Sequence, residues 1–144
     1  MGAFDLLILD FEGVCTPTVS QRIVDPDPPL EHAAAQRVVE RARSAGLTVV
    51  ILSNEIDPGW IATHPVLADA DHIVNCADNR IFKPDRRAFQ RCLLLSGATA
   101  ERTLVVDDDP DNVTVAASLG MTALRFDPDD VSGSWAAVDL ELSR

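Results

Sequence analysis

Five short, mostly apolar runs separated by stretches of helical periodicity constrain the fold of this chain most. Continuous apolar runs of about four to eight residues are typical of strands that are buried on both faces of a sheet. The predicted strands are residues 4–9, 47–52, 72–75, 103–106 and 121–126. The predicted helices between and after them are residues 29–45, 58–68, 84–96, 111–119 and 131–142, of which 58–68 is either a short helix or a turn.

This alternation predicts an α/β fold, namely a three-layer, Rossmann-like parallel sheet with helices on both faces. Within the helix predicted over 84–96, Pro84 suits the first turn. We expect Phe89, Cys92 and Leu93 of this helix to face inward, with Leu95 as a further candidate.

Length and composition predict one domain over residues 1–144. No apolar run approaches the ~20 residues that span a bilayer, and the N-terminal residues lack a signal-peptide pattern. These features predict a cytoplasmic protein that does not associate with membranes. The net charge of −11 opposes binding to nucleic acid. The sequence leaves open whether the protein forms a homo-oligomer.

The three cysteines are Cys15, Cys76 and Cys92. They form an odd count without Cys-x-x-Cys spacing, which favours small buried side chains over a metal site or a disulfide framework. His72 and Cys76 lie four residues apart on a predicted strand and its end, which does not favour a zinc pair.

Polar residues follow three of the predicted strands directly: Asp10, Ser53 and the pair Asp107 and Asp108. Because the carboxyl ends of parallel strands meet at one edge of the sheet, we expect these side chains to lie close together. The only lysine, Lys83, precedes a predicted helix, whereas the other eleven basic residues are arginine. Each residue alone fits a turn, a helix cap or a solvated loop, but their conjunction indicates a site.

Several carboxylates at one sheet edge repel one another, and Glu12 adds a further one near Asp10. Mg²⁺ prefers oxygen ligands and would offset this charge, with Lys83 as a second cation. Ser53 offers a hydroxyl, and with Asn54 it offers backbone N–H groups for an anion. A carboxylate nucleophile, a second acid, a metal and a lysine together are typical of phosphoryl transfer.

The sequence resembles the haloacid dehalogenase-like hydrolase superfamily from Leu6 to about Phe126. The family's Asp-x-Asp-Gly motif resembles residues 6–14, although Glu12 stands at the second acidic position. Its Ser/Thr motif resembles residues 49–54, its Lys-Pro motif residues 83–85, and its Asp-Asp motif residues 104–113. The four motifs occur in the family's order and spacing.

This resemblance implies a role for each position. Asp10 would be the nucleophile and a Mg²⁺ ligand. Glu12 would be the general acid and base and would bind the metal through its backbone carbonyl. Ser53 and Lys83 would hold the phosphoryl group.

In the fourth motif, Asp108 would complete the metal site, with Asp107 in a supporting role and Asn112 bracing the loop. The implied cofactor is Mg²⁺ and the implied partner is a phosphorylated substrate whose identity the sequence does not give. The segments 13–29 and 54–82 are too short for the cap domains that many relatives carry, so the resemblance implies a capless core with an open site. Residues 24–29 are either a stiff flap or a surface loop.

The function that follows is a Mg²⁺-dependent phosphomonoester hydrolase that acts through an aspartyl-phosphate. The alternative is a weak or inactive core that serves as a binding or regulatory module, because Glu12 carries one methylene more than Asp. That methylene displaces the carboxyl group by ~1.5 Å, and misplacement by ~1 Å can lower a rate by ~100-fold. A phospho-receiver domain fits less well, because its acidic pair comes first in the chain and its phosphorylated Asp follows.

Overall fold

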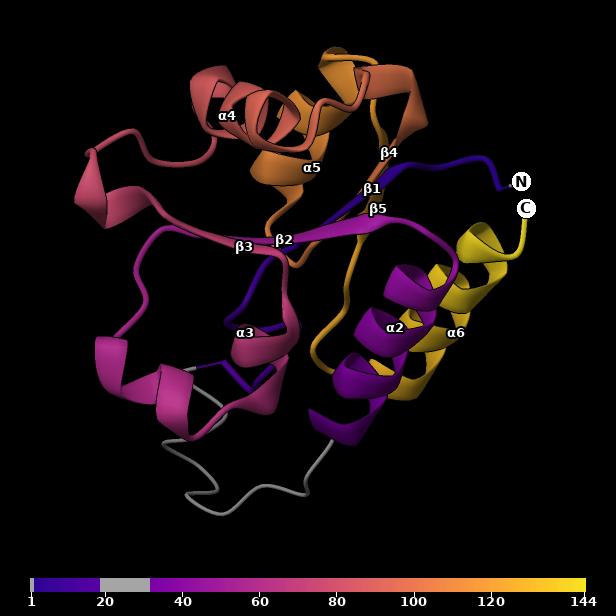
Figure 1. Cartoon of the computed structure of the whole chain (residues 1–144), viewed down its shortest axis with the longest axis horizontal. Coiled ribbons are helices and arrows are strands. Elements are labelled where there is room, and N and C mark those ends of the chain that lie inside the picture. Colours follow the sequence, from indigo (N-terminus) through magenta and orange to yellow (C-terminus); the bar gives the residue numbers. More distant parts are fainter. Residues whose placement is uncertain (1, 19–31) are drawn as a thin grey trace.

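A five-stranded parallel sheet forms the centre of the protein in the computed structural model, which describes residues 2–18 and 32–144. The strand order is β3-β2-β1-β4-β5, so β1 is central. The connections from β1 to β2, from β2 to β3 and from β4 to β5 join neighbouring strands, whereas the connection from β3 to β4 passes over β2 and β1 (Figure 1). The strands are β1 (Leu6–Leu9), β2 (Thr48–Ser53), β3 (His72–Asn75), β4 (Thr103–Asp107) and β5 (Thr122–Arg125).

Helices cover both faces of this sheet. The α-helices are α2 (His32–Ser44), α3 (Pro65–Asp69), α4 (Arg86–Ser96), α5 (Pro110–Ser118) and α6 (Val131–Leu142). Short 3₁₀ helices are η1 (Pro58–Ala62), η2 (Cys76–Asp78) and η3 (Ala100–Arg102). Helices α2, α3 and α6 pack on one face and α4 and α5 on the other, which confirms the predicted three-layer arrangement (Figure 1).

The central strand shows why the apolar runs are continuous. Leu7 and Leu9 point into the core beneath α2, α3 and α6, whereas Leu6 and Ile8 point into the core beneath α4 and α5. All four are at most 1% exposed. Because successive side chains of a strand alternate between faces, a strand covered on both sides has no solvent-facing position.

Most predicted elements are confirmed to within one or two residues, and α6 matches residues 131–142 as predicted. The prediction that Pro84 lies in the first turn of a helix is wrong. Helix α4 begins at Arg86, because the carboxylate of Asp85 accepts a hydrogen bond from the Arg87 amide and so caps the helix. Leu95, the further candidate for the inward face of this helix, does not face inward, since it is 45% exposed.

The three cysteines are buried, as the sequence predicts. In residues 2–18 and 32–144 no separate cap domain is present, and no helix there is long and apolar enough to cross a bilayer. The segment 24–29, interpreted from the sequence as a flap or a loop, lies outside the described residues.

Candidate active site

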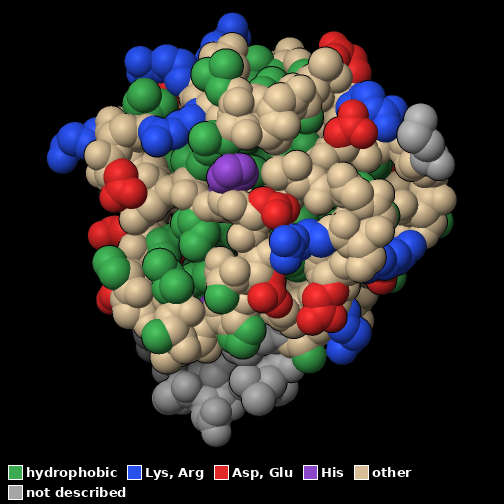
Figure 2. All heavy atoms as spheres, in the orientation of Figure 1, with side chains coloured by type: hydrophobic (Ala, Val, Ile, Leu, Met, Phe, Trp, Pro, Cys, Tyr) green, Lys and Arg blue, Asp and Glu red, His purple; other side chains and the backbone are tan. Residues whose placement is uncertain are grey.

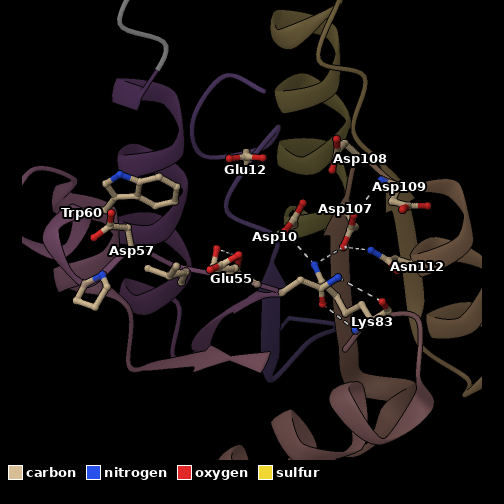
Figure 3. Close-up of a pocket in the computed structure, with 14 residues that line it drawn as sticks. Asp10, Glu12, Glu55, Asp57, Trp60, Lys83, Asp107, Asp108, Asp109 and Asn112 are labelled. Carbon is tan, nitrogen blue, oxygen red and sulfur yellow. Dashed lines mark hydrogen bonds and ion pairs between the residues drawn. The ribbon is translucent and has the colours of Figure 1, made fainter. Parts of the chain in front are cut away.

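A cavity of about 770 Å³ lies at the carboxyl ends of the strands. Three loops supply carboxylates to it: Asp10 and Glu12 follow β1, Glu55 and Asp57 follow β2, and Asp107 to Asp109 end and follow β4. The other lining residues are Ser53, Asn54, Ile56, Pro58, Trp60, Lys83 and Asn112. Figure 3 shows Asp57 and Trp60 on one side of the cavity and Asp107 to Asp109 on the other, with Asp10 between them. The predicted convergence of the strand ends is therefore present.

Lys83 joins these strand ends through a buried ammonium whose side chain is 3% exposed. Its Nζ donates hydrogen bonds to Asp10 Oδ1 at 2.9 Å, to Asp107 Oδ2 at 2.8 Å and to the Leu52 carbonyl at 2.9 Å. These three acceptors use all three N–H donors of the ammonium. A compact point charge fits this position and a planar guanidinium does not. This explains why a lysine stands here although the other eleven basic residues of the chain are arginine.

Asp10 directly follows β1, and its amide extends the pairing with β4 by donating to the Val106 carbonyl at 3.0 Å. Burial of the carboxyl group, which belongs to a residue only 9% exposed, raises its pKa from 3.8 to about 7. The Lys83 ammonium opposes this shift of the pKa, whereas the carboxylate of Asp108 adds to it. The Asp10 side chain is therefore poised between its neutral and ionised forms near pH 7.

Asp107 is fixed by more partners than Asp108. Its Oδ2 accepts hydrogen bonds from Lys83 and from Asn112 Nδ2 at 3.1 Å, and its Oδ1 accepts one from the Asp109 amide at 2.9 Å. Burial raises the pKa of both Asp107 and Asp108 above its usual range. The Asn112 side chain thus connects α5 to Asp107 at the end of β4.

Gly13 allows the loop after β1 to approach Asp108 closely. Its φ of +86° lies in the left-handed region, and a Cβ at this position would meet Asp108 Oδ2 at 2.5 Å. Glu12, one residue earlier, lines the cavity and bridges to Thr16 through its backbone. Position 13 therefore requires glycine for two reasons, the positive φ angle and the lack of room for a Cβ beside Asp108.

The loop after β2 is tied to the segment that carries Lys83. Asn54 Oδ1 accepts a hydrogen bond from the Lys83 amide at 2.8 Å, and Asn54 Nδ2 donates to the Lys83 carbonyl at 3.3 Å. The hydroxyl of Ser53, a buried residue at the cavity wall, donates to the Glu55 carbonyl at 3.0 Å. The Asn54 side chain thus positions the lysine, an arrangement that no spacing in the sequence signals.

Six further lining residues were not predicted from the sequence: Glu55, Ile56, Asp57, Pro58, Trp60 and Asp109. The run of polar and turn-forming residues after Ser53 gives only a general signal of a loop. The aromatic packing that fixes Trp60 is a tertiary feature, since its ring lies 5.6 Å from that of Phe11 and 6.1 Å from that of His64.

Carboxylate oxygens of Asp10, Asp107 and Asp108 lie within 4.8 Å of one another beside the Lys83 ammonium. An oxygen-only donor set of this kind suits a hard divalent cation, and a carboxylate beside an ammonium can attack an electrophilic centre. A family model for haloacid dehalogenase-like hydrolases matches residues 6–120, which is most of the chain and includes every one of these residues. The chain belongs to the haloacid dehalogenase-like hydrolases.

Solved structures support this hydrolase fold. An uncharacterised protein from Corynebacterium glutamicum is similar with a TM-score of 0.75 at 20% identity, over 97% of this chain and 96% of its own. A predicted hydrolase of the same family from Porphyromonas gingivalis has a TM-score of 0.73 at 15% identity, over 99% of both chains. A family enzyme from Bacteroides thetaiotaomicron, in complex with magnesium and inorganic phosphate, has a TM-score of 0.63 at 14% identity, over 87% of this chain and 95% of its own.

Asn54→Ala in this hydrolase should lower the free energy of unfolding by about 1–3 kcal/mol, because it removes two hydrogen bonds that each contribute ~0.5–1.5 kcal/mol. Urea unfolding followed by circular dichroism measures this change. Gln90→Ala, at an exposed position of α4, is the matched control and should change the value by less than ~0.5 kcal/mol. Equal stabilities of the two variants would show that the Asn54 contacts to Lys83 contribute nothing.

Proposed function

We propose that this haloacid dehalogenase-like hydrolase is a Mg²⁺-dependent phosphomonoester hydrolase that acts through an aspartyl-phosphate. The observation that carries the proposal is the buried Lys83 ammonium 2.9 Å from Asp10 Oδ1, in a cavity that also contains Ser53 and Asp108. A carboxylate nucleophile, a fixed cation and a hydroxyl on one cavity wall are the groups that transfer of a dianionic phosphoryl group requires.

The residues fit a magnesium ion. Asp10 and Asp108 would hold it with the backbone carbonyl of Glu12, and Asp107 lies close enough to support the site. All these ligand atoms are oxygens, which Mg²⁺ prefers. Without a metal, the pKa values of the three carboxyl groups are raised, mainly by burial, and a bound cation would lower them. When bound, the ion supplies positive charge that offsets the charge on the phosphoryl oxygens.

In the first step a carboxylate oxygen of Asp10 attacks phosphorus, and the bond from phosphorus to the alcohol oxygen breaks. The carboxyl group of Glu12 gives its proton to the departing alkoxide, which leaves as an alcohol. Lys83 and Ser53 hold the phosphoryl oxygens by hydrogen bonds during transfer.

In the second step the Glu12 carboxylate takes a proton from a water molecule, whose oxygen attacks phosphorus. The bond between phosphorus and the Asp10 oxygen breaks, so inorganic phosphate leaves and the carboxylate of Asp10 is restored. The similar enzyme from Bacteroides thetaiotaomicron, solved with magnesium and inorganic phosphate, supports this chemistry for the fold.

The test is release of inorganic phosphate from a panel of phosphomonoesters, including p-nitrophenyl phosphate, with MgCl₂ and with EDTA. We expect release only with the metal. Labelled substrate should also give a phosphoenzyme that is labile to hydroxylamine, the signature of an acyl-phosphate. Absence of metal-dependent release across the panel and across pH would refute the proposal and favour the binding-module alternative.

Glu12→Asp should raise kcat by about 10–100-fold, because the shorter side chain moves the proton donor by ~1.5 Å toward the position usual in active relatives. Steady-state kinetics with an alkyl phosphate measures the change, since a poor leaving group depends most on the acid. Glu12→Gln keeps the length of the side chain, lacks the acid, and should lower the rate. No gain from Glu12→Asp would point to a site whose other parts do not support turnover.

Added Mg²⁺ should raise the midpoint of thermal unfolding, Tm, more at pH 8 than at pH 5. The pKa of Asp10 lies at about 7 in the folded protein and near 3.8 when unfolded. In the absence of metal, Asp10 therefore takes up a proton on folding at any pH between these two pKa values. The contribution of Asp10 to the free energy of unfolding falls as the pH rises through this range. Mg²⁺ binds the ionised form, so protons compete with it at pH 5.

Calorimetry with and without MgCl₂ at both pH values measures this dependence. At a concentration about 100 times the dissociation constant at pH 8, we expect Tm to rise by ~5–10 °C. The same rise at pH 5 would contradict a metal site that includes the Asp10 carboxylate.

A further inference from the structure

The loop after β2 forms a wall of the cavity opposite the loop after β4. We call Glu55, Asp57 and Trp60 the β2-loop wall. Figure 3 shows Asp57 and Trp60 on the side of the cavity opposite Asp108 and Asp109. None of these wall residues has a role in the proposed phosphoryl-transfer steps, so the wall is placed to meet the part of the substrate that leaves as an alcohol.

The charge of the cavity is strongly unbalanced. Of the lining residues that the structure describes, seven carry carboxylates and one, Lys83, is basic. Lys83 is already engaged by two of those carboxylates, and a bound divalent ion would face the phosphoryl group. The potential at the β2-loop wall therefore stays negative when the phosphoryl position is filled, and it repels a second anionic group on the substrate.

Trp60 gives this wall an aromatic surface as well as charge. Its ring is partly exposed and is held by the rings of Phe11 and His64, with centroid distances of 5.6 and 6.1 Å. Asp57 is fixed next to it, because its Oδ1 accepts a hydrogen bond from the Gly59 amide at 2.9 Å and caps η1. An aromatic face beside carboxylates is the combination that binds organic ammonium groups.

Among residues 2–18 and 32–144, no arginine lines the cavity to offer a second anion position. The arginines near it in sequence, Arg80, Arg86, Arg87 and Arg91, are exposed, and Figure 2 shows basic side chains on the outer surface over α4. Within the described part of the chain, a substrate with two phosphates, or with a phosphate and a carboxylate, therefore meets one cationic lining group, Lys83.

From this geometry we infer that the hydrolase selects phosphomonoesters whose alcohol part carries a cationic nitrogen, which the β2-loop wall binds. This inference rests on the proposed phosphatase function and names its substrate class. The ammonium contacts the β2-loop wall, while the phosphoryl group is held by Lys83 and Ser53.

The test compares three alkyl phosphates that differ in the charge of the alcohol part. Choline phosphate carries a trimethylammonium group, 3,3-dimethylbutyl phosphate has the same shape with carbon in place of nitrogen, and the phosphate ester of 3-hydroxypropanoate carries a carboxylate. We expect kcat/KM to fall in that order, with about tenfold between the first two, mainly through KM. The preference should shrink as NaCl is raised, because Glu55 and Asp57 are exposed to solvent.

Variants assign the preference to the wall. Glu55→Gln combined with Asp57→Asn removes two charges and keeps shape and the cap of η1, since Asn also caps helices. It should reduce the ratio of choline phosphate to dimethylbutyl phosphate to nearly one, and Trp60→Leu should reduce it in part. Asp78→Asn combined with Asp129→Asn removes the same charge at exposed positions away from the cavity and should leave the ratio unchanged.

The possible results separate the two proposals. A ratio of one or less in the original protein, with clear hydrolysis of the neutral ester, overturns the inference and leaves the phosphatase proposal intact. A preference that the β2-loop wall variant does not change also overturns it. If no ester is hydrolysed, p-nitrophenyl phosphate included, the phosphatase proposal fails first and the inference fails with it.

Discussion

Asp10→Asn should abolish the metal-dependent release of phosphate, with kcat reduced by ~10⁴-fold or more. The amide has the size of the carboxylate but lacks its nucleophilic charge, so it cannot form the acyl-phosphate. Its Oδ1 can still accept the hydrogen bond from Lys83, which in the protein joins the two at 2.9 Å. We therefore expect a folded protein without activity.

Phosphate release and hydroxylamine-labile labelling measure the loss, and thermal unfolding checks the fold. A variant that unfolds at the same temperature and retains several per cent of the rate would mean that Asp10 does not attack phosphorus. In that case a directly activated water molecule would have to carry the reaction.

Lys83→Met should have the second large effect, because it acts on both activity and stability. Without the ammonium, the buried carboxylates of Asp10 and Asp107 lose their common counter-charge. Breaking a buried ion pair by removing one partner lowers the free energy of unfolding by ~3–5 kcal/mol, and loss of a fixed donor to the transition state lowers kcat by ~10²–10³-fold. Denaturant unfolding without metal and steady-state kinetics with metal measure the two losses.

Two further variants sharpen this experiment. Lys83→Arg keeps the charge but should also fail, since a planar guanidinium does not fit a position that serves three convergent acceptors. Arg87→Met breaks an exposed ion pair with Asp85 and should change stability by no more than ~1 kcal/mol. If Lys83→Met were as mild as Arg87→Met, the buried ammonium would have neither proposed role.

The fold was largely predictable because its three central strands, β2, β1 and β4, are buried on both faces. The run Leu6 to Leu9 has no polar residue, and Asp10 follows at once, so the pattern gives both the strand and the end where a site forms. The same logic places Ser53 and Asp107 at the same edge of the sheet. The sheet topology therefore explains why residues far apart in the sequence converge.

The remaining features depend on tertiary contacts that a sequence pattern does not contain. Asn54 holds Lys83 across 29 residues, and Trp60 is fixed by rings from other segments. The predicted start of α4 was wrong because both Pro84 and Asp85 are typical of the beginning of a helix. Only the capping hydrogen bond of Asp85, which is a feature of the structure, decides between them. Loops beyond the strands thus carry the part of the site that sets selectivity, where periodicity gives no information.

The full engagement of the Lys83 ammonium has a consequence for how a ligand enters. Each of its three N–H groups already has an acceptor, so an incoming phosphoryl oxygen can bind it only by exchange with Asp10, Asp107 or the Leu52 carbonyl. If Asp10 is the group displaced, the arrival of substrate itself unmasks the attacking oxygen. Without substrate, the Asp10 carboxylate would then stay hydrogen-bonded to Lys83, and it would become available as a nucleophile only when a phosphoryl group is bound.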